Sequence, residues 1–136
     1  MLYWLSKYGF EAARVDHTGI DLIARNRKTH EIMGVSVKSR SRNTGKEGQY
    51  VSIPNENFEK AKAACHAFGC TPYFAVVVDE ADVIWLFITS MRHLLELFPK
   101  GKRVSGWKMT DKHITQYLAD PQIKCAQLCC RTRKWW

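Results

Sequence analysis

Two short apolar segments joined by a polar turn constrain the fold of this chain most strongly. Residues 20–26, "IDLIARN", and residues 31–39, "EIMGVSVKS", are rich in Ile and Val and have the length of strands. The turn between them, residues 27–30, has no apolar side chain. We therefore expect the two segments to pair through this turn as neighbouring strands of one sheet.

Further strand-like and helix-like segments surround this pair. Residues 71–79 are almost continuously apolar, which indicates a strand that is buried on both faces. The predicted elements are a short N-terminal helix ended by Gly9, strands at 10–15, 20–26 and 31–39, a candidate short strand at 50–53, a helix at 55–68 ended by Gly69, strands at 71–79 and 82–89, and a helix at 91–98. This α-β-β-β-α-β-β-α order predicts an α/β or α+β fold with a mixed central sheet flanked by helices.

The length of 136 residues suits a single domain, and a hydrophobic content of 46% is enough for a packed core. We assign residues 1–100 to a core domain and residues 101–136 to a C-terminal extension that packs on the core or on a partner. Residues 100–109 look irregular, residues 110–120 have a weak helical pattern, and residues 121–136 have no clear pattern.

Positive charge dominates the composition, because 21 Lys and Arg residues face 13 Asp and Glu residues and leave a net charge of +8. Such an excess favours anionic partners, of which nucleic acid is the commonest. The N-terminal residues lack the pattern of a signal peptide, and every apolar run is far shorter than a membrane span. We therefore expect a cytoplasmic protein without a membrane segment, whose five cysteines are reduced thiols.

A carboxylate and a lysine are predicted to meet at one end of the paired strands. Side chains alternate between the two faces of a strand, so Ser36 and Lys38 share a face. Pairing through the turn brings Asp21 beside them. Phosphodiester hydrolysis uses such a pair, because a carboxylate holds Mg²⁺ while a lysine orients the attacking water and stabilises negative charge. The alternative is an ordinary pair of strands, in which Asp21 caps a turn and Lys38 is a solvated strand end.

These segments resemble the PD-(D/E)xK nuclease superfamily. The resemblance rests on "GIDLIA", "MGVSVKSR" and "TPYFAVVVDE", and residues 1 to about 90 follow the superfamily order of a helix, three strands, a helix and a strand. It implies a restriction-endonuclease-like fold, dependence on Mg²⁺ or Mn²⁺, and DNA as the substrate. By position, Asp21 corresponds to the metal-binding aspartate and Lys38 to the catalytic lysine, while Ile20 replaces the proline of the motif.

Two departures from the superfamily pattern concern the metal. Ser36 occupies the position of the second acid, between Asp21 and Lys38 in the predicted catalytic set, and its hydroxyl brings no charge, so Mg²⁺ should bind more weakly. Some restriction endonucleases with an S-x-K triplet take the missing carboxylate from the following helix, where Glu56 and Glu59 are the candidates. The first helix also lacks an acid. Alternatively, Ser36 is simply a small strand residue, and the two glutamates are a solvated helix start that complements the helix dipole.

Basic side chains follow the candidate site. Residues 40–49, "RSRNTGKEGQ", are predicted to form an exposed loop, because two glycines lie among polar and charged residues. A loop at that end of the sheet would present its cations beside Lys38, where they would contact phosphate groups or remain a solvated surface turn. The residues predicted to contact nucleic acid are Lys38, Arg40, Arg42, Lys46 and Gln49.

The C-terminal residues and the cysteines leave alternatives open. Residues 131–136, "RTRKWW", either bind nucleic acid by charge and stacking or pack on the domain or a partner subunit. Cys65, His66 and Cys70, or the three cysteines near the C-terminus, invite a zinc site, but their spacing does not match a paired Cys-x-x-Cys framework. Since Cys65 lies on the apolar face of its helix, we interpret it as a buried thiol.

The sequence therefore predicts a DNA-binding, Mg²⁺-dependent endonuclease. A homodimer is a candidate assembly, because nucleases that cut both strands often dimerise. The first alternative is a nucleic-acid-binding module with the same fold and a degenerate metal site. The second is an interaction protein whose basic surface meets an acidic protein.

Overall fold

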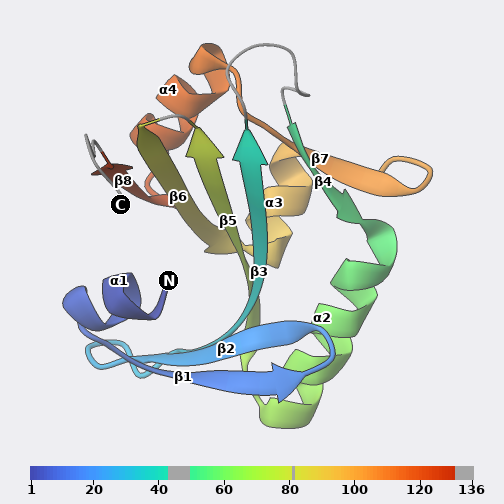
Figure 1. The fold of residues 1–136 in the computed structure, drawn as a ribbon. Helices are drawn as coiled ribbons and strands as arrows, with labels where there is room; N and C mark the ends of the chain where they lie inside the picture. The colour runs from blue at the N-terminus through green and yellow to red at the C-terminus, as the bar shows by residue number, and fades with distance from the viewer. Residues whose placement is uncertain (43–49, 81, 131–136) are drawn as a thin grey trace, which may run out of the picture.

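The computed structural model describes residues 1–42, 50–80 and 82–130, and its main feature is a six-stranded sheet with the strand order β1-β2-β3-β5-β6-β8 (Figure 1). A small second sheet pairs β4 with β7. The elements are α1 (Leu2–Lys7), β1 (Phe10–His17), β2 (Ile20–Asn26), β3 (Ile32–Arg42), β4 (Tyr50–Pro54), α2 (Asn55–Phe68), β5 (Thr71–Glu80), β6 (Val83–Ser90), α3 (Met91–Leu97), β7 (Val104–Lys108), α4 (Asp111–Ala119) and β8 (Lys124–Cys129).

The large sheet is mixed, as the order of elements predicts. β1, β2 and β3 pair antiparallel, and β5, β6 and β8 do the same. The two halves join where β3 runs parallel to β5, with a register from Met33 opposite Thr71 to Arg42 opposite Glu80. Parallel neighbours need a crossover, and α2 lies within it. The predicted fold class, a mixed central sheet flanked by helices, is therefore confirmed.

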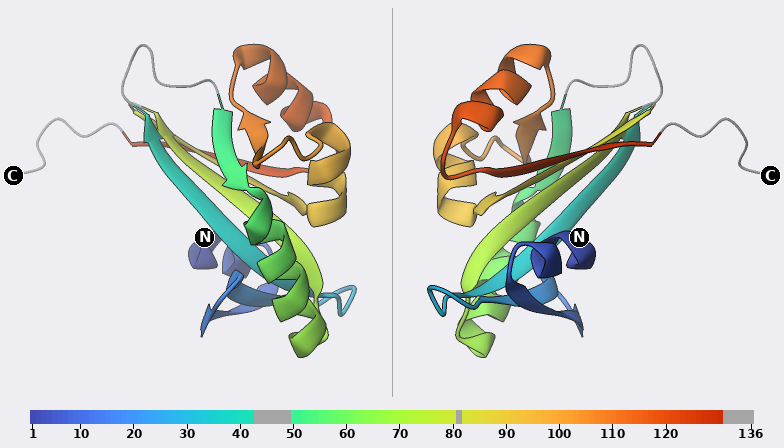
Figure 2. Two further views of the ribbon diagram at one scale, coloured as in Figure 1. Left: turned by 90° about the vertical axis from the view of Figure 1, so that its right-hand side faces the viewer. Right: turned by 90° about the vertical axis from the view of Figure 1, so that its left-hand side faces the viewer.

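The two faces of the large sheet are covered unequally (Figure 2). α2, α3, α4 and the small sheet cover one face, which holds the largest cluster of buried side chains. That cluster centres on Phe87, Trp107 and Tyr117, whose rings pack together, with 4.3 Å between the centroids of Trp107 and Tyr117. On the other face α1 packs through Leu5 against the first three strands. The face under α2 is the one that carries the candidate site.

The structure corrects two sequence-based expectations about element bounds. β3 continues to Arg42, so Arg40 and Arg42 are strand residues and not the start of a loop. Their basic, polar sequence suggested a loop, but β5 supplies a parallel partner for each β3 residue from Met33 to Arg42. Residues 104–108, expected to be irregular, form β7 because they pair with β4.

The chain after residue 100 contributes to both sheets. β7 completes the small sheet, and β8 pairs with β6 at the edge of the large one. Ile123 and Trp107 from this part of the chain are buried in the main core. Lys46, Gln49 and residues 131–136 lie outside the described residues. No helix among the described residues is both long and apolar enough to cross a bilayer.

Candidate nucleic-acid interface

Asp21 closes the open end of the β2–β3 pair. The register of the two strands sets Leu22 opposite Val35 and Ile23 opposite Gly34, so Asp21 faces the next position, Ser36. At this position the acceptor is a side chain and not a backbone carbonyl, because Asp21 Oδ2 accepts a hydrogen bond of 2.7 Å from the N–H of Val37. Asp21 therefore has a structural role, which is independent of its proximity to Lys38.

A glycine sets the distance between this strand end and α2. Gly19 has a φ of 106°, and a Cβ at this position would lie 2.4 Å from the carbonyl carbon of Lys60 and 2.9 Å from the backbone N of Ala61. No larger residue fits so close to a helix backbone in a left-handed conformation. The turn before Asp21 therefore packs directly on α2, and this contact places the carboxylate beside the helix.

Lys38 is half-buried on the face of β3 that α2 covers. Burial lowers the pKa of its ammonium group, the negative charge of Asp21 opposes that shift, and the positive charge of Lys60 adds to it. The net result is a pKa below the ordinary value for lysine. Asp21 and Lys38 are thus close enough to interact electrostatically, and a second ammonium group from α2 lies in the same field.

Ser36 lies between them on β3 but is buried. Only 2% of its surface is exposed, and its register partner on β5 is Phe74, whose ring packs on Phe58 of α2. Its neighbours thus include a large apolar contact, which suits a small strand residue better than a group that reaches solvent or an ion.

The two helix glutamates are engaged by cations. Glu56 Oε2 lies 2.9 Å from the Nζ of Lys60, which is one turn along α2. Glu59 Oε1 lies 2.6 Å from the Nζ of Lys100, and this hydrogen bond and charge hold the pKa of Glu59 below its ordinary value. Both pairs are largely exposed, so they add little stability. Among the described residues, neither glutamate belongs to a group of three or more potential metal ligands.

Asp21 is the candidate carboxylate for a Mg²⁺ site, and no group of described protein ligands accompanies it. In residues 1–42, 50–80 and 82–130, no three side chains of Asp, Glu, His or Cys are grouped so that they could hold a metal ion. The Asp21 carboxylate acts on Lys38 through its charge, and one of its oxygens already accepts the Val37 N–H. Mg²⁺ is usually bound through one or two carboxylates together with phosphate groups of a ligand, so Asp21 would need such a ligand to complete a Mg²⁺ site.

Arg40 extends the positive charge along β3. It lies two positions beyond Lys38 and so on the same face of the strand. Its Nη1 is 3.5 Å from the carbonyl oxygen of Tyr50, the first residue of β4. Arg42 is the last residue of β3. Of the residues predicted from sequence to contact nucleic acid, Lys38, Arg40 and Arg42 therefore belong to one strand. Lys46 and Gln49 lie in the part of the chain that is not described.

The described cysteines are all free thiols. Cys65 is buried, with 2% of its surface exposed, as its place on the apolar face of the helix predicts. None of the described cysteines belongs to a group that could hold a metal ion.

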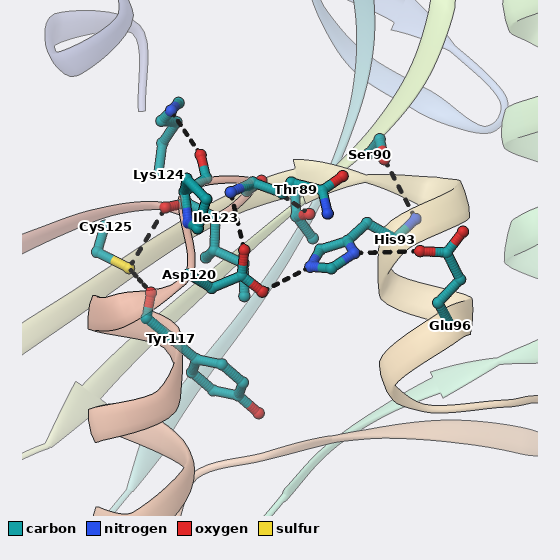
Figure 3. Close-up of polar contacts among 11 residues, drawn as sticks. Thr89, Ser90, His93, Glu96, Tyr117, Asp120, Ile123, Lys124 and Cys125 are labelled. Atoms are coloured by element: carbon teal, nitrogen blue, oxygen red, sulfur yellow. Dashed lines mark hydrogen bonds and ion pairs between the residues drawn. The ribbon is translucent and has the colours of Figure 1, made fainter.

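Sequence reasoning missed a second polar cluster, which is centred on His93 (Figure 3). His93 of α3 is buried, with its Nε2 2.7 Å from Asp120 Oδ2 and its Nδ1 3.2 Å from Glu96 Oε2. Burial alone would lower the pKa of His93, but the two carboxylates outweigh it and raise the pKa. The spacing of His93 and Glu96 suits one helix face, whereas Asp120 is 27 residues away and no sequence pattern connects it to them.

Comparison with known proteins identifies the fold. No protein-family model and no curated protein sequence matches the chain. Among solved structures, it is similar to Hjc, a Holliday junction resolvase from the archaeal hyperthermophile Archaeoglobus fulgidus. The TM-score is 0.60 and the sequence identity is 16%, over 85% of this chain and 88% of that chain. The chain therefore has the restriction-endonuclease-like fold of a junction resolvase.

Proposed function

We propose that this chain binds DNA through Lys38 and Arg40, which are partly exposed on the face of β3 beside α2 and contact the phosphate backbone. The observation that carries this proposal is the environment of Lys38: a half-buried ammonium group with a lowered pKa and a second ammonium group, that of Lys60, nearby. The net charge of +8 and the resolvase-like fold support the same conclusion.

The electrostatics favour a phosphate as the missing partner. Within the described ranges, no group hydrogen-bonds or forms an ion pair with the Lys38 ammonium, although Asp21 acts on it at longer range. A phosphate beside Lys38 would offset its desolvation and would relieve the repulsion between Lys38 and Lys60. Binding should therefore raise the pKa of Lys38 towards its ordinary value.

Branched DNA is the substrate class that we propose, since the similar solved structure is a Holliday junction resolvase. The test compares the affinity of the chain for a four-way junction and for linear duplex of the same length by fluorescence anisotropy. We expect tighter binding to the junction, and several-fold weaker binding by Lys38→Met. Lys28→Met is the matched control, because Lys28 is exposed in the turn at the opposite end of β3. Equal loss in both variants would refute a specific role for this face.

Metal-dependent cleavage of the phosphodiester bond is a second candidate function, favoured by the proximity of Asp21 to Lys38. Mg²⁺ or Mn²⁺ is the implied cofactor, and Asp21 is its candidate ligand. Because the described residues contain no group of three or more potential metal ligands, we place DNA binding first and hydrolysis second.

A cleavage assay on plasmid and four-way junction DNA with Mg²⁺ or Mn²⁺ separates the two functions. Asp21→Asn keeps an oxygen to accept the Val37 N–H but removes the charge. If the chain is a binding module, wild type does not nick DNA, and Asp21→Asn binds it more tightly because a negative charge is lost. If it is a nuclease, wild type nicks DNA, and both Asp21→Asn and Lys38→Met abolish the nicking.

We also propose that the chain acts as a homodimer, because a four-way junction has two symmetric halves for two copies to engage. Light scattering after size exclusion should give twice the chain mass of 15.7 kDa, alone or on junction DNA. A monomer in both conditions would contradict this assembly.

A further inference from the structure

Two cysteines at the C-terminal end of α2 have no part in the proposed function. Gly69 ends the helix in the left-handed conformation, with φ 61° and ψ 37°. The N–H of Cys70 then donates to the carbonyl of Cys65 at 2.9 Å, and the N–H of Gly69 donates to that of His66 at 3.4 Å. This Schellman turn folds the residue after the glycine back onto the last turn of the helix, so Cys65 and Cys70 become neighbours.

The two sulfur atoms lie over the same point of β3. A Cβ built on Gly34 would be 2.5 Å from Cys65 Sγ and 2.7 Å from Cys70 Sγ. The Cys65 Sγ is 3.7 Å from the carbonyl oxygen of Gly34, and Cys70 packs against the buried cluster that contains Cys65. Glycine at position 34 thus leaves room for two sulfurs, two positions before Ser36 on the same strand face.

We propose that Cys65 and Cys70 form an oxidisable dithiol, which a hydroperoxide converts into an intramolecular disulfide. The pair has the asymmetry that such a reaction needs, because Cys70 is partly exposed whereas Cys65 is buried. An oxidant therefore meets Cys70 first, and Cys65 is already in contact with it.

The reaction takes two steps. The Cys70 sulfur attacks the peroxide, the O–O bond breaks, and Cys70 becomes a sulfenic acid as water leaves. The Cys65 sulfur then attacks the Cys70 sulfur, the S–O bond breaks, and a second water leaves with the Cys65 proton. The two thiols lose two electrons and two protons, and the hydroperoxide, here hydrogen peroxide, is reduced to two waters.

The second step should be slow at neutral pH. Burial, and after it the neighbouring Cys70, raises the pKa of the Cys65 thiol to about 12, so little thiolate exists at neutral pH. Disulfide formation should therefore accelerate as the pH rises.

Mass spectrometry of a single peptide tests the proposal. Trypsin cleavage after Lys62 and Arg92 releases residues 63–92, which contain Cys65 and Cys70 and no other cysteine. The reduced, folded protein is treated with hydrogen peroxide, denatured, and labelled with iodoacetamide before digestion. We expect this peptide to lose two hydrogens and carry no label, and dithiothreitol to restore both labels. Oxidation of Met91 in the same peptide adds oxygen, so the mass distinguishes it.

Two variants control the result. Cys70→Ser should leave Cys65 fully labelled after the same treatment, because the buried thiol then lacks its partner. Cys129→Ser should form the internal disulfide as wild type does, because Cys129 is on β8. If both cysteines of wild type remain labelled, or if Cys70 is over-oxidised while Cys65 still takes the label, the proposal is wrong.

Discussion

Two polar clusters of this protein differ in how completely their charged groups are paired with other groups of the protein. In the cluster of His93, Asp120 and Glu96, each ring nitrogen of the histidine faces a carboxylate oxygen within 3.2 Å. At the candidate interface, Asp21 binds a backbone N–H, while Lys38 interacts with Asp21 and Lys60 only through their charges.

The difference separates a structural cluster from a binding site. The histidine cluster joins α3 to the residue that follows α4, and both ring nitrogens are used within the protein (Figure 3). A charged group whose hydrogen-bonding atoms are paired within the protein stabilises the fold and has few free atoms with which to bind a ligand. Lys38 is held in a partly desolvated position without such a partner, which is the state that an anionic ligand improves.

His93→Ala should have the largest effect on stability. It removes two hydrogen bonds to carboxylates and leaves Asp120, which is partly buried, without its partner. We expect a loss of about 1.5–3 kcal/mol in the free energy of unfolding, measured by urea denaturation. His66→Ala is the matched control on the exposed side of α2 and should change stability by less than about 0.5 kcal/mol. If His93→Ala and His66→Ala lower the free energy of unfolding equally, the His93 cluster does not stabilise the fold more than an exposed histidine does.

Replacement of Asp21 should separate its structural role from its charge. Asp21→Ala leaves the Val37 N–H without its acceptor and should cost about 1 kcal/mol. Asp21→Asn retains an acceptor oxygen and should cost less. Thermal unfolding of both variants gives the comparison. If Asn destabilises as much as Ala does, the charge and not the hydrogen bond holds this end of the sheet.

The pH dependence of stability should show a smaller effect, because neutral His93 keeps one of its two hydrogen bonds. The pKa of His93 is raised in the folded state, above the value of about 6.5 for an unfolded histidine. Its contribution is therefore complete below pH about 6.5 and is lost as the pH rises through the folded-state pKa. The stability difference between wild type and His93→Gln should shrink across that range. A difference that stays constant would show that folding does not raise the pKa of His93.

At the acid end the same cluster should weaken for a different reason. Burial opposes the charge of Asp120, but the hydrogen bond from His93 outweighs it and lowers the pKa of this carboxyl. A lowered pKa gives stability that is present above the unfolded value and is lost as the pH falls through the folded value. Asp120→Asn should therefore flatten the acid limb of the stability profile. An unchanged acid limb would assign it to other carboxylates.

Much of the fold follows from local sequence patterns, and the rest depends on distant partners. The periodicity of residues 20–39 and the apolar run at 71–79 predict β2, β3 and β5, and Gly69 predicts the end of α2. β7 and β8 could not be predicted, because their partners β4 and β6 lie about 40 or more residues away along the chain and neither has a strong pattern of its own.

The candidate site was predictable in part for the same reason. Strand alternation places Ser36 and Lys38 on one face, and a short turn brings Asp21 to them. The hydrogen bond from Val37 to Asp21 depends on where the backbone ladder stops, which no residue pattern records. The burial of Ser36 and the pairing of Glu59 with Lys100 depend on how α2 and the chain after it pack.

The salt dependence of DNA binding tests the central claim most directly. Each phosphate contact releases counterions, so the slope of log Kd against log salt concentration counts such contacts. If Lys38 contacts a phosphate, Lys38→Met should reduce the slope by about 1, and Lys28→Met should leave it unchanged. An unaltered slope in Lys38→Met, with DNA still bound, would show that the DNA lies elsewhere on the protein.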